Sequence, residues 1–301
     1  MCLVAGKYFP DVGWVLAKNR DLTYKPTIRI RKSVRRDIER LYIWDEQSKF
    51  TEGVNEYGVA IVSASVINEK EGTAGSGLSG AQNRVYYSPE GFRIRTALFE
   101  RNAIKAVKKL IELEITGNTL VADAETCFVL EASYQDKDGT ERYVFQAKEV
   151  PQNTIVVRTN HGIMLPWTGY NGDVPHETAD RNSSESRYQK AIEGLLKTAT
   201  MQEMLDVISH QGKEPSKEKN PQMNPLRSKN ENSQTKMRTT GQLVLVPKDK
   251  TLHYRPVWCE TLFDMESLNK QEEKTYFEVI SNRKLITFKE SLDKENLNVI
   301  L

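Results

Sequence analysis

Two reactive groups come together at position 2 of this chain. Cys2 follows Met1, and a small side chain here is one that methionine aminopeptidase leaves as the new first residue. A thiolate is a strong nucleophile, and a free α-amine has a pKa of about 7.7, so it can act as a base near neutral pH. Removal of Met1 would therefore place a nucleophile and its own general base on one residue. Judged from this residue alone, the alternative is that a cysteine stands at this position by chance.

A carboxylate that could hold such an amine follows the second predicted strand. Residues 2–9 and 13–18 are strand-like runs joined by turn chemistry at Pro10-Asp11, which predicts a hairpin. If the hairpin is tight, Asp21 returns to the N-terminus and can accept a hydrogen bond from the α-ammonium of Cys2. A plain turn aspartate is the alternative interpretation.

Composition limits the classes of function. The chain has 301 residues, of which 38% are hydrophobic and 28% charged, and its net charge is +2. This length suits one large domain or two small ones, and we predict a single domain over residues 1–301. The small net charge gives no field that would favour nucleic acid or a membrane. We expect a small-molecule amide or peptide as partner, and the sequence leaves a homo-oligomer open.

Neither a membrane segment nor a metal site is expected. No apolar run approaches the roughly 20 residues that span a bilayer, and Lys7, Asp11 and Lys18 interrupt any signal-peptide core. Three cysteines are too few for a disulfide framework, and the four histidines form no His-x-x-x-His pair. We therefore expect a reduced cytoplasmic location and no metal or cofactor.

The remaining chain alternates strands and helices. The arginine-rich stretch 28–40 predicts a strand with one solvent-exposed face. Its arginines are either solvated or attract an anionic substrate. Apolar spacing predicts a helix over 95–115 that Gly117 closes, a second that Ser183 or Ser184 caps, and a third that opens with the capping box Thr200-Glu203. Other predicted elements are a tight turn at 55–58, a buried strand at 59–65, short strands within 120–160, strands at 241–247 and 252–258, a surface loop at 67–92, and a polar mobile loop or solvated linker at 211–238.

Seven motifs in order resemble one family. They are Met1-Cys2, Lys18-Asn19-Arg20-Asp21, Gly53-x-Asn55-x-x-Gly58-Val59-Ala60, Asp123 with Val129-Leu130-Glu131, Thr159-Asn160-His161, Ser183-Ser184-x-Ser186-Arg187-Tyr188 and Thr239–Pro247. Together they resemble the cysteine N-terminal-nucleophile (Ntn) hydrolases, in the branch of acyl-coenzyme A:6-aminopenicillanate acyltransferase. A more distant likeness is to the choloylglycine hydrolases, which are bile salt hydrolase and penicillin V acylase.

The resemblance implies a fold and a set of site residues. The fold would be α+β, a four-layer αββα sandwich of antiparallel sheets flanked by helices. Cys2 would be nucleophile and, through its amine, base, while Asp21 would orient that amine. The roles implied for the other residues are as follows: the side-chain amide of Asn160 and a backbone N–H near Ser65 donate to the oxyanion, Arg187 stabilises Cys2 or Asp21, and Ser65, His161 and Trp167 bind substrate.

Two departures from the family pattern bear on the substrate. Choloylglycine hydrolases carry arginine where this chain has Lys18, and often asparagine where it has Ser65. Bile salts and penicillin V are therefore doubtful substrates. The fungal acyltransferase carries a propeptide before its cysteine, whereas here removal of Met1 is the expected maturation.

The resemblance predicts an amidohydrolase or acyltransferase that acts on a linear amide or thioester through an acyl-enzyme. One alternative is a non-catalytic binding protein on the same scaffold, which would use residues 29–40 and 211–238. Another is an amidotransferase-like glutaminase, but Leu3 replaces the glycine that normally follows that nucleophile, and no synthase domain accompanies it.

Overall fold

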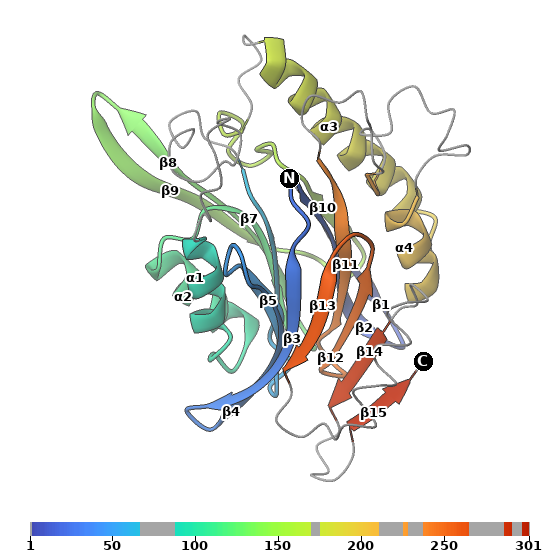
Figure 1. The fold of residues 1–301 in the computed structure, drawn as a ribbon. Coiled ribbons are helices and arrows are strands. Elements are labelled where there is room, and N and C mark those ends of the chain that lie inside the picture. Colours follow the sequence, from blue (N-terminus) through green and yellow to red (C-terminus); the bar gives the residue numbers. More distant parts are fainter. Residues whose placement is uncertain are drawn as a thin grey trace.

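The computed structural model describes residues 2–66, 88–169, 175–210, 225–227, 237–264, 286–290 and 297–300. Two sheets form its centre (Figure 1). The first sheet has the order β10-β1-β2-β11-β12-β14-β15, with these strands: β1 (Cys2–Phe9), β2 (Gly13–Leu22), β10 (Ile155–Arg158), β11 (Arg238–Val246), β12 (Thr251–Pro256), β14 (Ile286–Glu290) and β15 (Leu297–Ile300).

The second sheet has the order β13-β3-β4-β5-β6-β7-β8-β9. Its strands are β3 (Thr27–Arg35), β4 (Ile38–Asp45), β5 (Thr51–Asn55), β6 (Ala60–Ala64), β7 (Gly117–Ala122), β8 (Cys127–Lys137), β9 (Thr140–Glu149) and β13 (Glu260–Asp264). Neighbouring strands are antiparallel throughout both sheets, apart from the parallel pair of β13 and β3.

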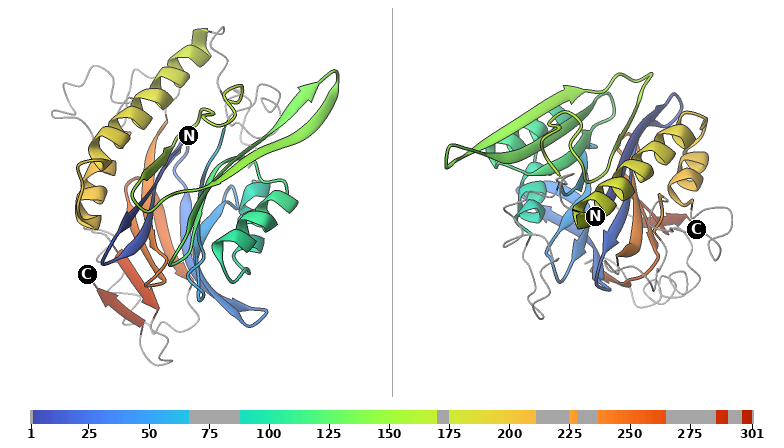
Figure 2. Two further views of the ribbon diagram at one scale, coloured as in Figure 1. Left: turned by 180° about the vertical axis from the view of Figure 1, so that it is seen from behind. Right: turned by 90° about the horizontal axis from the view of Figure 1, so that it is seen from above.

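Two pairs of helices cover the outer faces of the sheets (Figures 1 and 2). Helices α1 (Pro89–Ala97) and α2 (Ala103–Glu112) pack against the second sheet, and α3 (Pro175–Leu195) and α4 (Met201–Ile208) pack against the first. A third apolar cluster fills the space between the sheets, where Trp14, Leu16 and Tyr254 are fully buried. The predicted αββα sandwich is therefore confirmed by the arrangement of these layers.

The first hairpin forms as its sequence predicts. Phe9 pairs with Gly13 beside the turn, and Cys2 pairs with Arg20 at the open end. Because directly opposed residues of antiparallel strands share a face, the side chains of Cys2 and Arg20 both point between the sheets. Asp21, the next residue along β2, points to the opposite face, toward the helices.

Several predicted boundaries need correction. The single helix expected over 95–115 is two helices, because Asn102 caps a new one by accepting a hydrogen bond from the Lys105 backbone N–H. Gly117, with φ of +102°, begins β7 rather than closing the helix. The expected loop 67–92 overlaps α1 from Pro89, and its residues 67–87 lie outside the described residues.

Helix α3 begins at Pro175, so Ser183 and Ser184 lie within it and do not cap it as expected. The capping box predicted at Thr200 and Glu203 is confirmed, with both reciprocal hydrogen bonds present. Most of the polar stretch 211–238 lies outside the described residues, but residues 225–227 are described and Arg238 already belongs to β11. After the last predicted strand, at 252–258, the structure has three further strands, β13, β14 and β15.

Candidate active site

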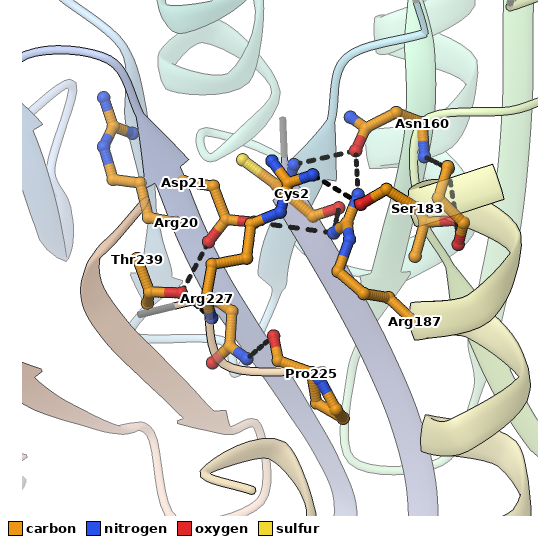
Figure 3. Close-up of polar contacts among 12 residues, drawn as sticks. Cys2, Arg20, Asp21, Asn160, Ser183, Arg187, Pro225, Arg227 and Thr239 are labelled. Carbon is orange, nitrogen blue, oxygen red and sulfur yellow. Dashed lines mark hydrogen bonds and ion pairs between the residues drawn. The ribbon is translucent and has the colours of Figure 1, made fainter. Parts of the chain in front are cut away.

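The backbone nitrogen of Cys2 lies in a buried polar cluster at the start of β1 (Figure 3). It donates a hydrogen bond to Asn160 Oδ1 at 3.0 Å, and the Cys2 residue is only 8% exposed. While Met1 is attached this nitrogen is an amide, and removal of Met1 would turn it into the α-amine. The cluster therefore surrounds the group that would act as the base.

Hydrogen bonds fix the backbone of Asn160 and of the residues before and after it. Its own N–H donates to Ser184 Oγ on α3 at 2.9 Å. The side-chain amide of Asn118, on β7, donates to the carbonyls of Thr159 at 3.0 Å and His161 at 3.2 Å. These contacts hold the backbone at the end of β10 so that the Asn160 side chain reaches Cys2.

The orientation of the Asn160 amide follows from its partners. Arg187 Nη2, which can only donate, lies 3.0 Å from Oδ1, and the Ser65 carbonyl, which can only accept, lies 2.6 Å from Nδ2. The oxygen therefore faces Cys2 and Arg187, and the nitrogen faces Ser65. An amide NH₂ has two N–H donors, and Ser65 takes one of them.

Arg187 connects the other members of the cluster. Its side chain is fully buried, and Nη1 donates to the Cys2 carbonyl at 3.0 Å. The same nitrogen lies 3.5 Å from Asp21 Oδ2. Arg187 is therefore a buried residue that contacts both Cys2 and Asp21, and the stabilising role that the resemblance implies for it remains a prediction.

Asp21 is fully buried on the same side of the sheet as Arg187. Its Oδ1 accepts a hydrogen bond from Thr239 Oγ1 on β11 at 2.7 Å, and its Oδ2 lies 3.8 Å from Arg227 Nε as well as near Arg187. The structure therefore brings Asp21 into the cluster around Cys2. The role expected for it, as the group that orients the amine, remains a prediction.

The thiol side of Cys2 faces different charges. Arg20, opposite Cys2, forms a buried ion pair with Asp45, and Tyr24 donates to the same carboxylate at 2.7 Å. Burial lowers the pKa of Arg20, but Asp45, Tyr24, Glu52 and the Cys2 thiol outweigh it, and the net shift is upward. Arg20 is therefore a permanent cation on the face that carries the thiol.

Lys18, two residues before Arg20, is also buried and paired. Its Nζ lies 2.7 Å from Glu52 Oε1 and 2.6 Å from the Ser63 carbonyl. Glu52 Oε1 also accepts the Ser63 N–H at 2.8 Å. Ser63 lies on β6, two residues before Ser65, so the Lys18–Glu52 pair holds the strand that leads to the Asn160 partner.

The three residues predicted to bind substrate, Ser65, His161 and Trp167, have different surroundings. His161 Nδ1 lies 2.9 Å from Ser184 Oγ and 3.1 Å from Thr159 Oγ1, and its ring meets Tyr188 edge to face. Burial lowers the pKa of His161, which favours the neutral ring. Trp167 is 43% exposed, and Ser65 is also an exposed residue. Their contact with substrate remains a prediction.

Glu131 explains the shape of the loop that carries His161 and Trp167. Its fully buried carboxylate accepts the backbone N–H groups of Ile163, Met164 and Leu165 at 2.8–3.1 Å. The glutamate of the Val129-Leu130-Glu131 motif thus holds the loop that follows Asn160, and these hydrogen bonds do not involve Cys2.

Sequence reasoning missed three residues that position this cluster: Asn118, Arg227 and Thr239. Arg227 lies in a polar stretch with no helical or strand pattern, and Asn118 is a single amide in a short strand, so neither carried a signal. Thr239 fell within a recognised motif, but nothing in the sequence showed that β11 lies beside β2.

Comparisons with known proteins give a distant structural likeness. One match is the C2A mutant of the conjugated bile acid hydrolase from Clostridium perfringens, with a TM-score of 0.49 and 11% identity over 100% of this chain and 97% of that chain. Another is the penicillin V acylase from Agrobacterium tumefaciens, with a TM-score of 0.41 and 12% identity over 99% and 94% of the two chains. These are the two kinds of enzyme that the motifs resemble at a distance. No family model and no curated protein sequence matches the chain.

Two features are absent from the described residues. Within them, no helix is both long and apolar enough to cross a membrane. The same part of the chain holds no group of three or more His, Cys, Asp and Glu side chains placed to bind a metal ion.

Proposed function

We propose that this protein hydrolyses a linear, non-peptide amide bond through Cys2, and that an amine can replace water to give acyl transfer. One observation carries the proposal: the Cys2 nitrogen lies in a buried, fully organised cluster with Asn160, Arg187 and Asp21. A buried backbone N–H needs an acceptor in any protein. What supports the proposal is that the same cluster also places Arg187 on the Cys2 carbonyl and close to Asp21, around a residue that carries a thiol.

The reaction begins when the α-amine takes the proton of the Cys2 thiol. The sulfur attacks the carbonyl carbon, and the carbonyl oxygen becomes an oxyanion. We assign two donors to this oxyanion, the second N–H of Asn160 Nδ2 and the backbone N–H of Ser65. Each such donor typically stabilises the transition state by about 3 kcal/mol. The carbon–nitrogen bond then breaks, and the α-ammonium returns its proton to the leaving amine.

The thioester that remains is resolved by the same groups. The α-amine takes a proton from water, the hydroxide attacks the acyl carbon, and the carbon–sulfur bond breaks to release a carboxylic acid and regenerate Cys2. An amine in place of water gives a new amide by the same steps. A thioester substrate would enter this scheme with a thiol as its leaving group.

Lys18 and Ser65 argue for a substrate other than bile salts or penicillin V. Lys18 replaces an arginine of the choloylglycine hydrolases, and here its ammonium group donates hydrogen bonds to Glu52 and to the Ser63 carbonyl. A point-charge ammonium with these partners has no planar fork to offer a carboxylate of the substrate. We therefore propose as substrate a small molecule or peptide that carries a linear amide other than a peptide bond.

The test starts from protein expressed with its own N-terminus. Intact mass should show loss of Met1, and iodoacetamide should alkylate Cys2 far faster than Cys127, which is fully buried and whose thiol pKa is raised by burial. A panel of N-acyl amino acids, N-acyl amines and lactams should then give an acyl adduct on Cys2. The matched control carries one residue appended before Cys2, which turns the amine into an amide and should abolish turnover without unfolding the chain. Equal slow labelling of all three cysteines, or full activity of the control, would contradict the proposal.

A further inference from the structure

Strand β9 forms an open edge of the second sheet. It comes last in the order of that sheet, and among the described residues β8 is the one strand that pairs with it. The ten residues of β9 pair with β8 in one unbroken register. Residues 140–142 and 145–149 are exposed, and the β8–β9 hairpin projects from the body of the molecule, away from α3 and α4 (Figures 1 and 2). An uncovered edge of this length is a template for another strand.

Every second residue of β9 points its backbone groups to this edge. The Val150 N–H donates to the Cys127 carbonyl on β8 at 2.8 Å, so these two residues form a hydrogen-bonded position of the ladder. Such positions alternate along an antiparallel pair. The even-numbered residues of β9 therefore bond to β8, and the odd-numbered residues, from Glu141 to Glu149, present their N–H and C=O groups to the edge.

The odd-numbered residues also carry aromatic rings. Tyr143 lies opposite Tyr134 on β8 with the ring centroids 5.7 Å apart, and its centroid is 5.8 Å from that of Phe145. The Tyr143 hydroxyl donates to the Ile115 carbonyl at 2.9 Å, so this row of rings lies on the face that α1 and α2 cover. Phe145 is 44% exposed. Apolar surface is thus exposed at the same edge as the outward-facing backbone groups.

We infer that β9 is an interface between two copies of this chain, whose β9 strands pair antiparallel about a two-fold axis at Val144. Tyr143 of each copy then lies directly opposite Phe145 of the other, so the aromatic row continues across the interface. The odd-numbered residues supply the hydrogen bonds, and the two second sheets become one continuous sheet. Because both copies use the same strand, the contact closes at a dimer. The inference does not depend on the reaction at Cys2.

Charge argues against neighbouring registers. An axis at Phe145 would place Glu141 of one copy opposite Glu149 of the other. The same axis would place Arg142 opposite Lys148, and like charges that are directly opposed destabilise a strand pair. An axis two residues earlier would set the carboxylate of Glu141 against the ring of Phe145.

The axis at Val144 avoids these contacts. Arg142 of each copy then lies opposite Gln146 of the other, and Lys148 lies opposite Thr140. No like charges are directly opposed along the β9 pair. The sequence of β9 therefore complements itself in this register, which favours a second copy of the chain as the strand that occupies the edge.

Cysteine cross-linking tests the register. Residues that face each other at a non-hydrogen-bonded position have Cα atoms about 4.5 Å apart, which a disulfide can bridge. Val144→Cys, in a Cys2→Ala background that removes the thiol expected to be most reactive, should therefore give a disulfide-linked dimer on mild oxidation. Phe145→Cys in the same background is the matched control. Its two Cα atoms would lie about 8 Å apart, too far for a disulfide, so it should stay unlinked.

Sedimentation tests the dimer itself. The wild type should be a dimer at about 0.1 mM, a concentration at which small interfaces form. Phe145→Lys places a charge on the edge against Tyr143 of the second copy and should make the protein monomeric. Leu196→Lys is the matched control, because it adds the same charge at a residue that is 67% exposed and follows α3, on the side of the first sheet. It should remain a dimer, and circular dichroism checks that both variants fold.

Three outcomes would overturn the inference. A wild type that stays monomeric at about 0.1 mM would leave the edge of β9 to a strand of a different protein. A dimer that survives Phe145→Lys would mean that the copies meet through another surface. Cross-linking through position 145 but not position 144 would mean that the axis is wrongly placed. The sedimentation result decides on the interface even if Val144→Cys fails to fold.

Discussion

Asn160 Oδ1 accepts a hydrogen bond from the backbone nitrogen of Cys2 at 3.0 Å, across 158 residues of chain. The two residues meet because β10 pairs antiparallel with β1, so the segment that leaves β10 passes the start of β1. Arg187 then fixes the oxygen from α3. The nitrogen that would serve as the base is therefore positioned by two elements that lie more than 150 residues away in the sequence.

Removal of the thiol should abolish turnover and leave the fold intact. Cys2→Ala deletes one sulfur atom at the edge of the inter-sheet core, so we expect a loss of about 1 kcal/mol or less in the free energy of unfolding. Cys2→Ser should keep little activity, because a hydroxyl is a far weaker nucleophile at neutral pH. Rates for a reactive amide and thermal unfolding of each variant check this. Wild-type rates in Cys2→Ala would exclude the mechanism.

Local chemistry predicted the elements that carry Cys2 and Asp21. The first hairpin, the turn at Asn55 and Gly58 and the capping box at Thr200 depend on neighbouring residues, and all three are present. Helix boundaries were less predictable, since the break at Asn102 depends on a cap that competes with continuous apolar spacing.

The site was predictable only where a motif pointed to it. Asn160 and Arg187 came from the resemblance, and no periodicity would have paired either with Cys2. Arg227 could not be found at all, because its contacts with Ser183 and Asp21 join segments whose proximity depends on the tertiary fold. A polar stretch without apolar periodicity looks the same whether or not one of its arginines is buried.

Removal of one partner of the buried Lys18–Glu52 pair should destabilise the fold strongly. Both side chains are at most 1% exposed, so Lys18→Met leaves a buried carboxylate without its cation. We expect this variant to lose about 3–5 kcal/mol in the free energy of unfolding, measured by urea denaturation. The double variant Lys18→Met, Glu52→Gln removes both charges and should recover much of the loss. A single variant within about 0.5 kcal/mol of the wild type would show that the pair is not buried in solution.

Stability should fall in mild acid because of His253. Burial lowers the pKa of its ring to about 4, and the nearby Asp249 only partly opposes this shift. Between the ordinary pKa of about 6.5 and this value, the unfolded chain binds a proton that the folded chain does not. The free energy of unfolding should therefore decrease as pH falls from about 6.5 to about 4, by up to about 3 kcal/mol from this residue, and level off below.

The variant His253→Gln isolates that contribution. Urea denaturation of both proteins from pH 7 to pH 4 should show a smaller decrease for the variant, since the titrating ring is gone. His161, whose pKa burial also lowers, remains in both proteins and contributes equally to each. Parallel pH profiles for the two proteins would mean that the ring of His253 is accessible to protons in the folded state.

Asn160 carries two roles that substitution can separate. Its oxygen accepts from Cys2 and Arg187, and its nitrogen, which donates to Ser65, is the group that we assign to the oxyanion. Asn160→Ala removes both and should lower the chemical rate by about 10²–10³ with substrate binding nearly unchanged. Asn160→Asp keeps an acceptor for Cys2 and Arg187 but has no N–H and adds negative charge where the oxyanion forms.

If the donor role dominates, Asn160→Asp will be slower than Asn160→Ala in single-turnover acylation. If holding the Cys2 nitrogen dominates, the order will be reversed, because the aspartate still accepts that bond. His161→Ala is the matched comparison from the same motif, since His161 contacts Thr159 and Ser184 on the helix side. A loss in kcat far larger for His161→Ala than for Asn160→Ala would mean that the oxyanion donor is wrongly assigned and that an imidazole belongs in the site.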